Sequence, residues 1–197
     1  MKFPLFATAA LMIGLTACAP LPKMSSQIGF SATLPATRWD HRPEADVWTK
    51  AMLDALKTDG AVLLSSIPQD IDIYCPGYED ASPDDRAAFW VGMFSAIAKY
   101  ESTWNPAAKG GGGRYLGLLQ ISPATARHVG CDSKGLLDGA TNLDCAVRIA
   151  ANRAPSSGVA GLTTANLTTD WGPMHDRSKR AEVAAWTSAQ SYCQPEK

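Results

Sequence analysis

The sequence predicts a mainly α-helical domain, and three observations carry this prediction. Apolar residues recur at helical spacing between positions 47 and 56 and again between 89 and 98. Ser-Pro pairs at 82–83 and 122–123 are typical of helix starts, with serine as the cap and proline in the first helical position. The 197 residues are 46 % hydrophobic and 19 % charged, which is enough apolar material for a core.

The balance of basic and acidic residues argues against a nucleic-acid partner. The chain has 18 basic and 19 acidic residues and a net charge of −1. It therefore lacks the overall basic field that nucleic-acid binding uses, and we expect no nucleic-acid partner.

The N-terminal segment has the features of a secretory signal peptide. Residues 1–17 combine a positive start with an apolar stretch shorter than the roughly 20 residues that span a bilayer, which is typical of a secretory signal. They end in Leu15-Thr16-Ala17-Cys18, which resembles the bacterial lipobox. The resemblance implies cleavage before Cys18, a lipid anchor on that residue and, because Ala19 follows, an outer-membrane lipoprotein facing the periplasm. The alternative is an ordinary signal peptide followed by a chance cysteine.

The segments that follow are assigned by composition and spacing. Residues 18–40 are rich in Pro, Ser, Thr and Ala and are predicted to be a flexible tether, with the folded domain over 41–197. A helix is predicted from Pro43 to Gly60. Its apolar stripe consists of Val47, Trp48, Ala51, Met52, Ala55 and Leu56.

The strongest helix signal begins at Ser82 and ends at Asn105-Pro106. Glu101 continues its apolar stripe, eleven residues after Trp90. A carboxylate on an apolar stripe, near a helix C-terminus, should have a raised pKa, which suits a general acid. The alternative is a glutamate that simply reaches solvent at a frayed helix end.

The rest of the chain is predicted to be short helices joined by loops. The glycine run 110–113 predicts a flexible loop, and residues 114–121 form a short apolar segment. Helices are predicted from Ser122 to Gly130, over 142–151, and from Asp176 or Ser178 to Tyr192.

The cysteines fit an oxidising compartment. Without Cys18 four remain, and four cysteines allow three pairings. We favour Cys131–Cys145, which are close in sequence, together with Cys75–Cys193, which would tie the chain end to its middle. No Cys-x-x-Cys is present and the three histidines are scattered, so we expect no metal site.

Two linked motifs resemble the core of the soluble lytic transglycosylase (SLT) domain. That family shows Glu-Ser, a nearby Asn-Pro, then Gly-Leu-Met-Gln-Ile, Pro and Thr-Ala at the spacing found here, with Leu119 replacing the usual Met. A weaker resemblance continues past Leu136 and Asn142 to Ala150. The matching residues are Glu101-Ser102-Thr103-Trp104-Asn105-Pro106 and Gly117-Leu118-Leu119-Gln120-Ile121-Ser122-Pro123-Ala124-Thr125-Ala126.

The resemblance implies a lysozyme-like helical fold with a short irregular or β segment near the active-site cleft. It implies cleavage, without cofactor, of the β-1,4 bond between N-acetylmuramic acid and N-acetylglucosamine in peptidoglycan glycan strands. Glu101 matches the catalytic glutamate, acting first as acid and then as base while the muramic acid 6-hydroxyl closes onto C1. Gln120 and Tyr115 would contact the glycan, and Ser102, in the same site, would hold the loop around Glu101 in shape.

Departures from the family pattern leave two alternatives. One family tyrosine is replaced by Ile149, and the motif of the other is reduced to Asp170-Trp171-Gly172-Pro173, so Trp171 is predicted to take the place of the aromatic residue in glycan binding. Asp170 or Asp176 as a second carboxylate would favour hydrolysis, as in a muramidase. The other alternative is a lipoprotein that binds peptidoglycan without cleaving it. The sequence identifies no protein partner.

Overall fold

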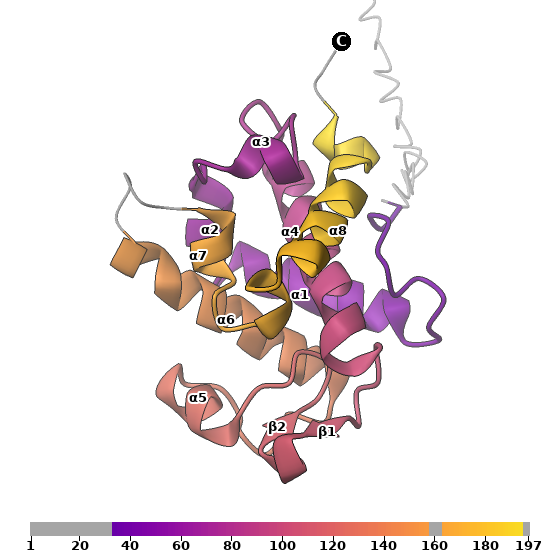
Figure 1. Ribbon diagram of the computed structural model, residues 1–197, viewed down its shortest axis with the longest axis vertical. Coiled ribbons are helices and arrows are strands. Elements are labelled where there is room, and N and C mark those ends of the chain that lie inside the picture. The colour runs from indigo at the N-terminus through magenta and orange to yellow at the C-terminus, as the bar shows by residue number, and fades with distance from the viewer. Residues whose placement is uncertain (1–32, 158–162, 195–197) are drawn as a thin grey trace, which may run out of the picture. The chain divides into compact units, whose positions relative to one another are not determined.

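The structure, a computed structural model, describes residues 33–157 and 163–194 (Figure 1). The predicted signal peptide and Cys18 lie outside the described residues. The described chain is mainly helical with a small β hairpin, which confirms the predicted fold class. No described helix is both long and apolar enough to cross a membrane.

Helix α4 (Pro83–Ser102) is the central element of the domain. Ser82 caps it as predicted, because its Oγ accepts the backbone N–H of Asp85 at 3.1 Å. Every residue from Ala87 to Ala98 is buried, so α4 is covered around its whole circumference. The elements that contact it include α1 (Ala45–Lys57), α2 (Ala61–Ser65), α8 (Arg177–Ser188), η3 (Gly172–Met174) and η4 (Ser191–Cys193).

Helix α1 packs against α6 (Gly139–Ser157) (Figure 1). The predicted stripe of α1 buries Trp48, Met52 and Leu56, whereas Val47 is 61 % exposed because the buried face is narrower than predicted. The short helices α3 (Ile71–Tyr74) and α7 (Thr164–Leu167) contact α8 and α6, respectively.

The predicted irregular or β segment is an antiparallel hairpin at the end of the domain where α4 ends (Figure 1). Strand β1 (Lys109–Gly110) pairs with β2 (Tyr115–Leu116), and the turn η1 (Gly111–Gly113) joins them. All three turn glycines have positive φ, a backbone conformation that other residues rarely adopt. Helix α5 (Pro123–His128) follows the hairpin.

The folded unit begins earlier in the chain than the sequence indicated. Thr37 and Trp39, within the predicted tether, are 6 % and 0 % exposed and belong to the core. The backbone N–H of Arg38 donates to Ser95 Oγ of α4 at 2.9 Å, and its guanidinium pairs with Glu182 of α8 at 2.6 Å. The compact unit therefore starts at Thr33 rather than after residue 40.

Both predicted disulfides are present. Cys75 pairs with Cys193 across 118 residues, and Cys131 pairs with Cys145 across 14. The first joins the segment before α4 to the end of the described chain, and the second joins the loop after α5 to α6.

Candidate active site

Glu101 lies in the last turn of α4, just beyond the fully buried part of the helix. The residue is half-buried. Burial raises the pKa of its carboxyl to about 7, while the charge of Lys179 and the backbone N–H of Gly172 lower it. The direction agrees with the sequence-based expectation. A carboxyl that titrates near neutrality can both donate and accept a proton at physiological pH.

The end of α4 is held in place by its own side chains. Ser102 Oγ donates to the carbonyl of Leu118 at 2.8 Å, which ties the helix end to the segment after the hairpin. Thr103 and Trp104 follow in the left-handed region, with φ of 52° and 55°, and the indole N–H of Trp104 donates to Ser95 O at 2.9 Å. This arrangement supports the predicted role of Ser102 in shaping the chain around Glu101.

Asn142 positions the segment that carries Gln120, a role the sequence did not indicate. It is fully buried on α6, where its Oδ1 accepts the backbone N–H of Leu119 at 2.9 Å. Its Nδ2 donates to the carbonyls of Leu116 and Leu136 at 2.9 and 3.0 Å. The local signal was an amide at a helix position next to apolar residues, whereas two of its three partners, Leu119 and Leu116, are 23 and 26 residues away in sequence.

Gly117 is required where the segment passes Asn142. Its φ is +78°, and a Cβ added there would overlap the carbonyl of Leu136 and the amide of Asn142. A side chain at this position therefore meets both an unfavourable backbone conformation and a packed, buried amide.

Gly117→Ala is expected to lower the free energy of unfolding by about 3 kcal/mol, because left-handed strain and overpacking add. Chemical denaturation measures this loss. Gly112→Ala is the matched control: its φ is +70°, yet nothing lies within 4 Å of an added Cβ. The control should cost only about 1 kcal/mol, and equal losses in the two variants would refute the packing argument.

The side-chain amide nitrogen of Gln120 forms hydrogen bonds within the protein. Its backbone is left-handed, with φ of 47°, and its Nε2 donates to Gly117 O at 2.8 Å and to Ala108 O at 3.3 Å. These bonds fix the orientation of the amide. Among the described residues none donates a hydrogen bond to its Oε1, which leaves an acceptor for a ligand.

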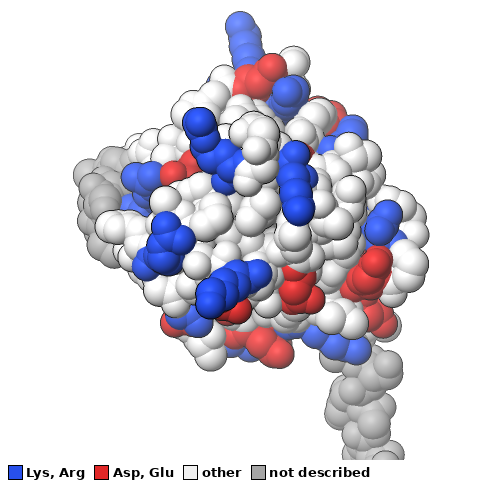
Figure 2. Space-filling view, turned by 90° about the horizontal axis from the view of Figure 1, so that it is seen from below, with Lys and Arg blue, Asp and Glu red and all other residues white. Residues whose placement is uncertain are grey.

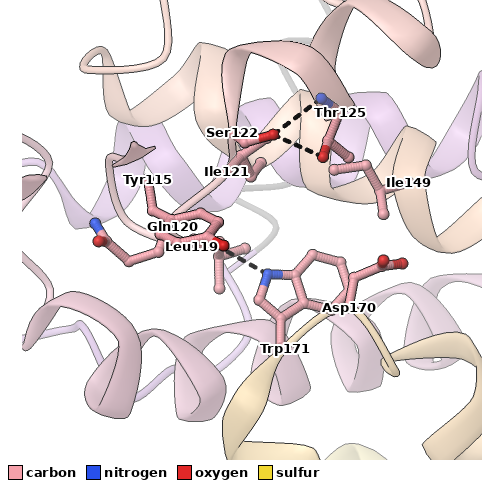
Figure 3. Close-up of a pocket in the computed structure, with 9 residues that line it drawn as sticks. All are labelled: Tyr115, Leu119, Gln120, Ile121, Ser122, Thr125, Ile149, Asp170 and Trp171. Carbon is pink, nitrogen blue, oxygen red and sulfur yellow. Dashed lines mark hydrogen bonds between the residues drawn. The ribbon is translucent and has the colours of Figure 1, made fainter. Parts of the chain in front are cut away.

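Three predicted site residues, Tyr115, Gln120 and Trp171, line one cavity of about 60 Å³. In Figure 3, Tyr115 and Gln120 lie on one side of it, and Ile149 and Asp170 on the other. Tyr115 is 41 % exposed at the rim. Glu101 and Ser102 are not among the lining residues, so the acid and this cavity are separate parts of the candidate site. The remaining lining residues are Leu119, Ile121, Ser122 and Thr125.

Trp171 forms the floor of this cavity. It is 2 % exposed, its indole N–H donates to the carbonyl of Leu119 at 3.0 Å, and its ring packs edge-on against Phe94. It is one of the residues that line the cavity (Figure 3). Glycan contact by Trp171 stays a prediction, and its 2 % exposure leaves little of the side chain for such a contact. Trp171 also has a structural role. It precedes η3 and joins that element to α4 through Phe94 and to the segment before Gln120 through Leu119.

The two other candidate carboxylates are engaged by the protein. Asp170 lines the cavity, and both of its oxygens bind Arg153, at 2.6 and 2.8 Å. Asp176 caps α8, where hydrogen bonds from Ser178 and Lys179 hold its pKa below the ordinary value. Among the described residues, no group of three or more His, Cys, Asp or Glu could hold a metal ion.

The exposed face around the hairpin and α5 has scattered positive charge. Figure 2 looks onto this end of the domain and shows Lys and Arg side chains spaced around a largely uncharged area. The exposed cations of the hairpin, α5 and the following loop are Lys109, Arg114, Arg127 and Lys134.

The fold, mainly helical with a small β hairpin, is lysozyme-like and similar to that of the transglycosylase SLT domain. The family model of the transglycosylase SLT domain matches residues 82–158, less than half of the chain, which contain α4, the hairpin, α5 and the whole of α6. SLT domains cleave peptidoglycan, and the match suggests an activity of this kind.

The chain is similar in structure to DslA. The wild-type form 2 of Bd0314 DslA matches with a TM-score of 0.69 and 26 % identity, covering 81 % of this chain and 98 % of that one. A glutamate-to-glutamine mutant of DslA gives a TM-score of 0.69 at 25 % identity, with the same coverage. None of the curated proteins matches this chain.

Proposed function

We propose that the protein is a lytic transglycosylase, a carbon–oxygen lyase that cleaves the bond between N-acetylmuramic acid and N-acetylglucosamine. The observation that supports this most directly is the half-buried Glu101 carboxyl, with its pKa raised to about 7. Asp170 and Asp176 are both occupied by other groups, which favours a reaction that needs one carboxyl rather than two.

In the proposed reaction Glu101 starts protonated. Its proton passes to the glycosidic oxygen as the C1–O bond breaks, and Glu101 becomes a carboxylate. The muramic acid 6-hydroxyl then bonds to C1 and returns its proton to Glu101, which leaves 1,6-anhydro-N-acetylmuramic acid. Gln120 Oε1 and the exposed ring of Tyr115 are the proposed glycan contacts. The hydrogen bond of Ser102 to Leu118 would hold the end of α4 in a fixed position relative to them.

Mass spectrometry of fragments released from purified peptidoglycan tests the reaction. The enzyme would be the chain without residues 1–18, which keeps the compact unit that begins at Thr33. Products that end in 1,6-anhydro-N-acetylmuramic acid support the proposal. Folded protein that binds peptidoglycan and releases nothing would contradict it, and would favour the binding lipoprotein.

Hydrolysis is the alternative that one observation favours, since Asp170 lines the same cavity as Gln120. A muramidase would yield reducing-end products instead of anhydro products. Asp170→Asn then distinguishes the two reactions, because it should abolish reducing-end products in a muramidase. In a transglycosylase it would act only by loosening the pair with Arg153.

The pH dependence of cleavage follows from the raised pKa of Glu101. Because the acid form starts the reaction, kcat/KM should fall tenfold per pH unit above an apparent pKa of about 7. Initial rates of fragment release between pH 5 and pH 9 on soluble glycan strands (both limits being about two units from that pKa) provide the measurement. A profile that stays flat through this range would rule out Glu101 as the general acid.

The disulfides and the SLT domain indicate an extracytoplasmic, periplasmic setting. We further propose that Cys18 carries the lipid and anchors the protein to the outer membrane, as its lipobox-like sequence suggests. Metabolic labelling with a fatty-acid probe should label the wild type but not Cys18→Ser. Equal labelling of the two would refute the proposed anchor.

A further inference from the structure

Lys179 of α8 reaches the catalytic end of α4. Its backbone N–H donates to Asp176 Oδ1 at 3.1 Å, which fixes the residue in the first turn of α8. Its half-buried side chain extends to Tyr100, with Nζ 5.5 Å from the ring centroid. Tyr100 directly precedes Glu101, so Lys179 lies at the same end of α4 as the candidate acid.

A second lysine contacts the same ring but has its charge compensated. Lys99 Nζ lies 5.1 Å from the Tyr100 centroid, and it also binds Glu182 Oε1 at 2.8 Å. Arg38 shares that oxygen at 2.6 Å. In the described part of the chain, by contrast, no carboxylate lies within ion-pair distance of Lys179. The two lysines therefore share a neighbouring ring and differ in whether their charge is paired.

The groups that act on Glu101 come from two elements packed against it. They are Lys179 of α8 and the backbone N–H of Gly172 in η3, and both favour the carboxylate over the acid. On its own helix the neighbouring cation is Lys99, which Glu182 holds. Lys179 is thus the side-chain charge that opposes the effect of burial.

We propose that Lys179 is a positioning residue that acts through Glu101, its unpaired ammonium stabilising the carboxylate that forms when Glu101 gives up its proton. The inference rests on the proposed role of Glu101. Lys179 keeps its own protons throughout. The proton moves from Glu101 to the leaving oxygen, and it is replaced by the one from the 6-hydroxyl. The positive charge of Lys179 favours proton transfer from Glu101 to the leaving oxygen. It does so by partly offsetting the effect of burial, which favours the protonated carboxyl.

Lys179→Met tests this inference because it removes the charge and keeps the length of the side chain. The Glu101 pKa is read directly from the carboxyl ¹³C shift in NMR, without substrate. It should rise by roughly 0.5 to 1 pH unit, and the descending limb of the pH–rate profile should move by the same amount. Lys179→Arg should restore the wild-type titration.

Lys99→Met is the matched control, because it removes a charge beside the same ring. It should leave the Glu101 titration unchanged, and thermal unfolding verifies that both variants fold. An unchanged Glu101 pKa in Lys179→Met, or equal shifts in the two variants, would overturn the inference. If the wild type releases no glycan fragments, the proposed function fails on its own, and the NMR titration still decides whether Lys179 acts on Glu101.

Discussion

Glu101→Gln should abolish glycan cleavage, with fragment release falling by about 10³-fold or more. One side chain is proposed to supply the proton of the first step and to accept that of the second, so its loss removes both contributions. Glutamine keeps the size of the side chain and can still form hydrogen bonds, but its amide is neither acidic enough to donate a proton nor basic enough to accept one. Fragment release from purified peptidoglycan, quantified by mass spectrometry at pH 6, measures the loss at a pH about one unit below the Glu101 pKa, where the acid form predominates.

The same variant should be more stable than the wild type at alkaline pH. The folded-state pKa of Glu101 is raised from 4.5 to about 7, so its ionisation destabilises the fold progressively over that interval and by a constant amount above it. Glu101→Gln does not ionise. Its advantage in free energy of unfolding should be absent near pH 4 and reach about 2–3 kcal/mol above pH 7.

Denaturation of both proteins at pH 4 and pH 8 provides the test and also shows that the variant is folded. An inactive Glu101→Gln with no pH-dependent gain in stability would mean that the carboxyl is not desolvated in the folded protein. A fully active Glu101→Gln would refute its role as the acid.

Removing the Cys75–Cys193 disulfide should have the largest effect on stability. The bond closes a loop of 118 residues. In the chain-entropy model such a closure stabilises the fold by about 5 kcal/mol, because it restricts the unfolded chain. The double replacement Cys75→Ser with Cys193→Ser avoids a free thiol, and denaturant unfolding measures the loss.

Cys131→Ser with Cys145→Ser is the comparison for loop length. This disulfide closes a loop of 14 residues, for which the same model gives about 3 kcal/mol. The long-loop variant should therefore be the less stable of the two by about 2 kcal/mol. The reverse order would show that local contacts around each bond, and not chain entropy, determine the effect.

The parts of the fold that the sequence predicted are those with local signals. Ser82 and Pro83 mark the start of α4 because a cap acts on its own helix turn. The motif around Glu101 and Gln120 is likewise continuous in the chain. The role of Asn142 was not predictable in this way, since it depends on carbonyls of Leu116 and Leu136 that only the fold brings together.

Tertiary packing also explains the differences at Trp39 and Trp171. A Pro- and Ser-rich composition suggested a tether up to residue 40, yet Trp39 is fully buried and its indole donates to Thr49 at 3.0 Å. Trp171 was predicted from a Gly-Pro match as a sugar-binding aromatic. Its ring packs edge-on against Phe94 of α4, a contact that no local sequence pattern reveals.

The docking of residues 36–39 on the core has a mechanical consequence. A force that pulls on the N-terminal end of the domain would act first on the segment that begins at Thr33. The first hydrogen bonds to oppose it are those between Ala36 and Tyr192 and between Arg38 and Ser95. Ser95 belongs to α4, and Glu101 lies in the last turn of the same helix. A chain held at its N-terminal end while gripping a glycan strand would therefore carry load along the helix that bears the acid. The middle of that helix, residues 87–98, is buried on all sides, so its packing would oppose displacement under such a load.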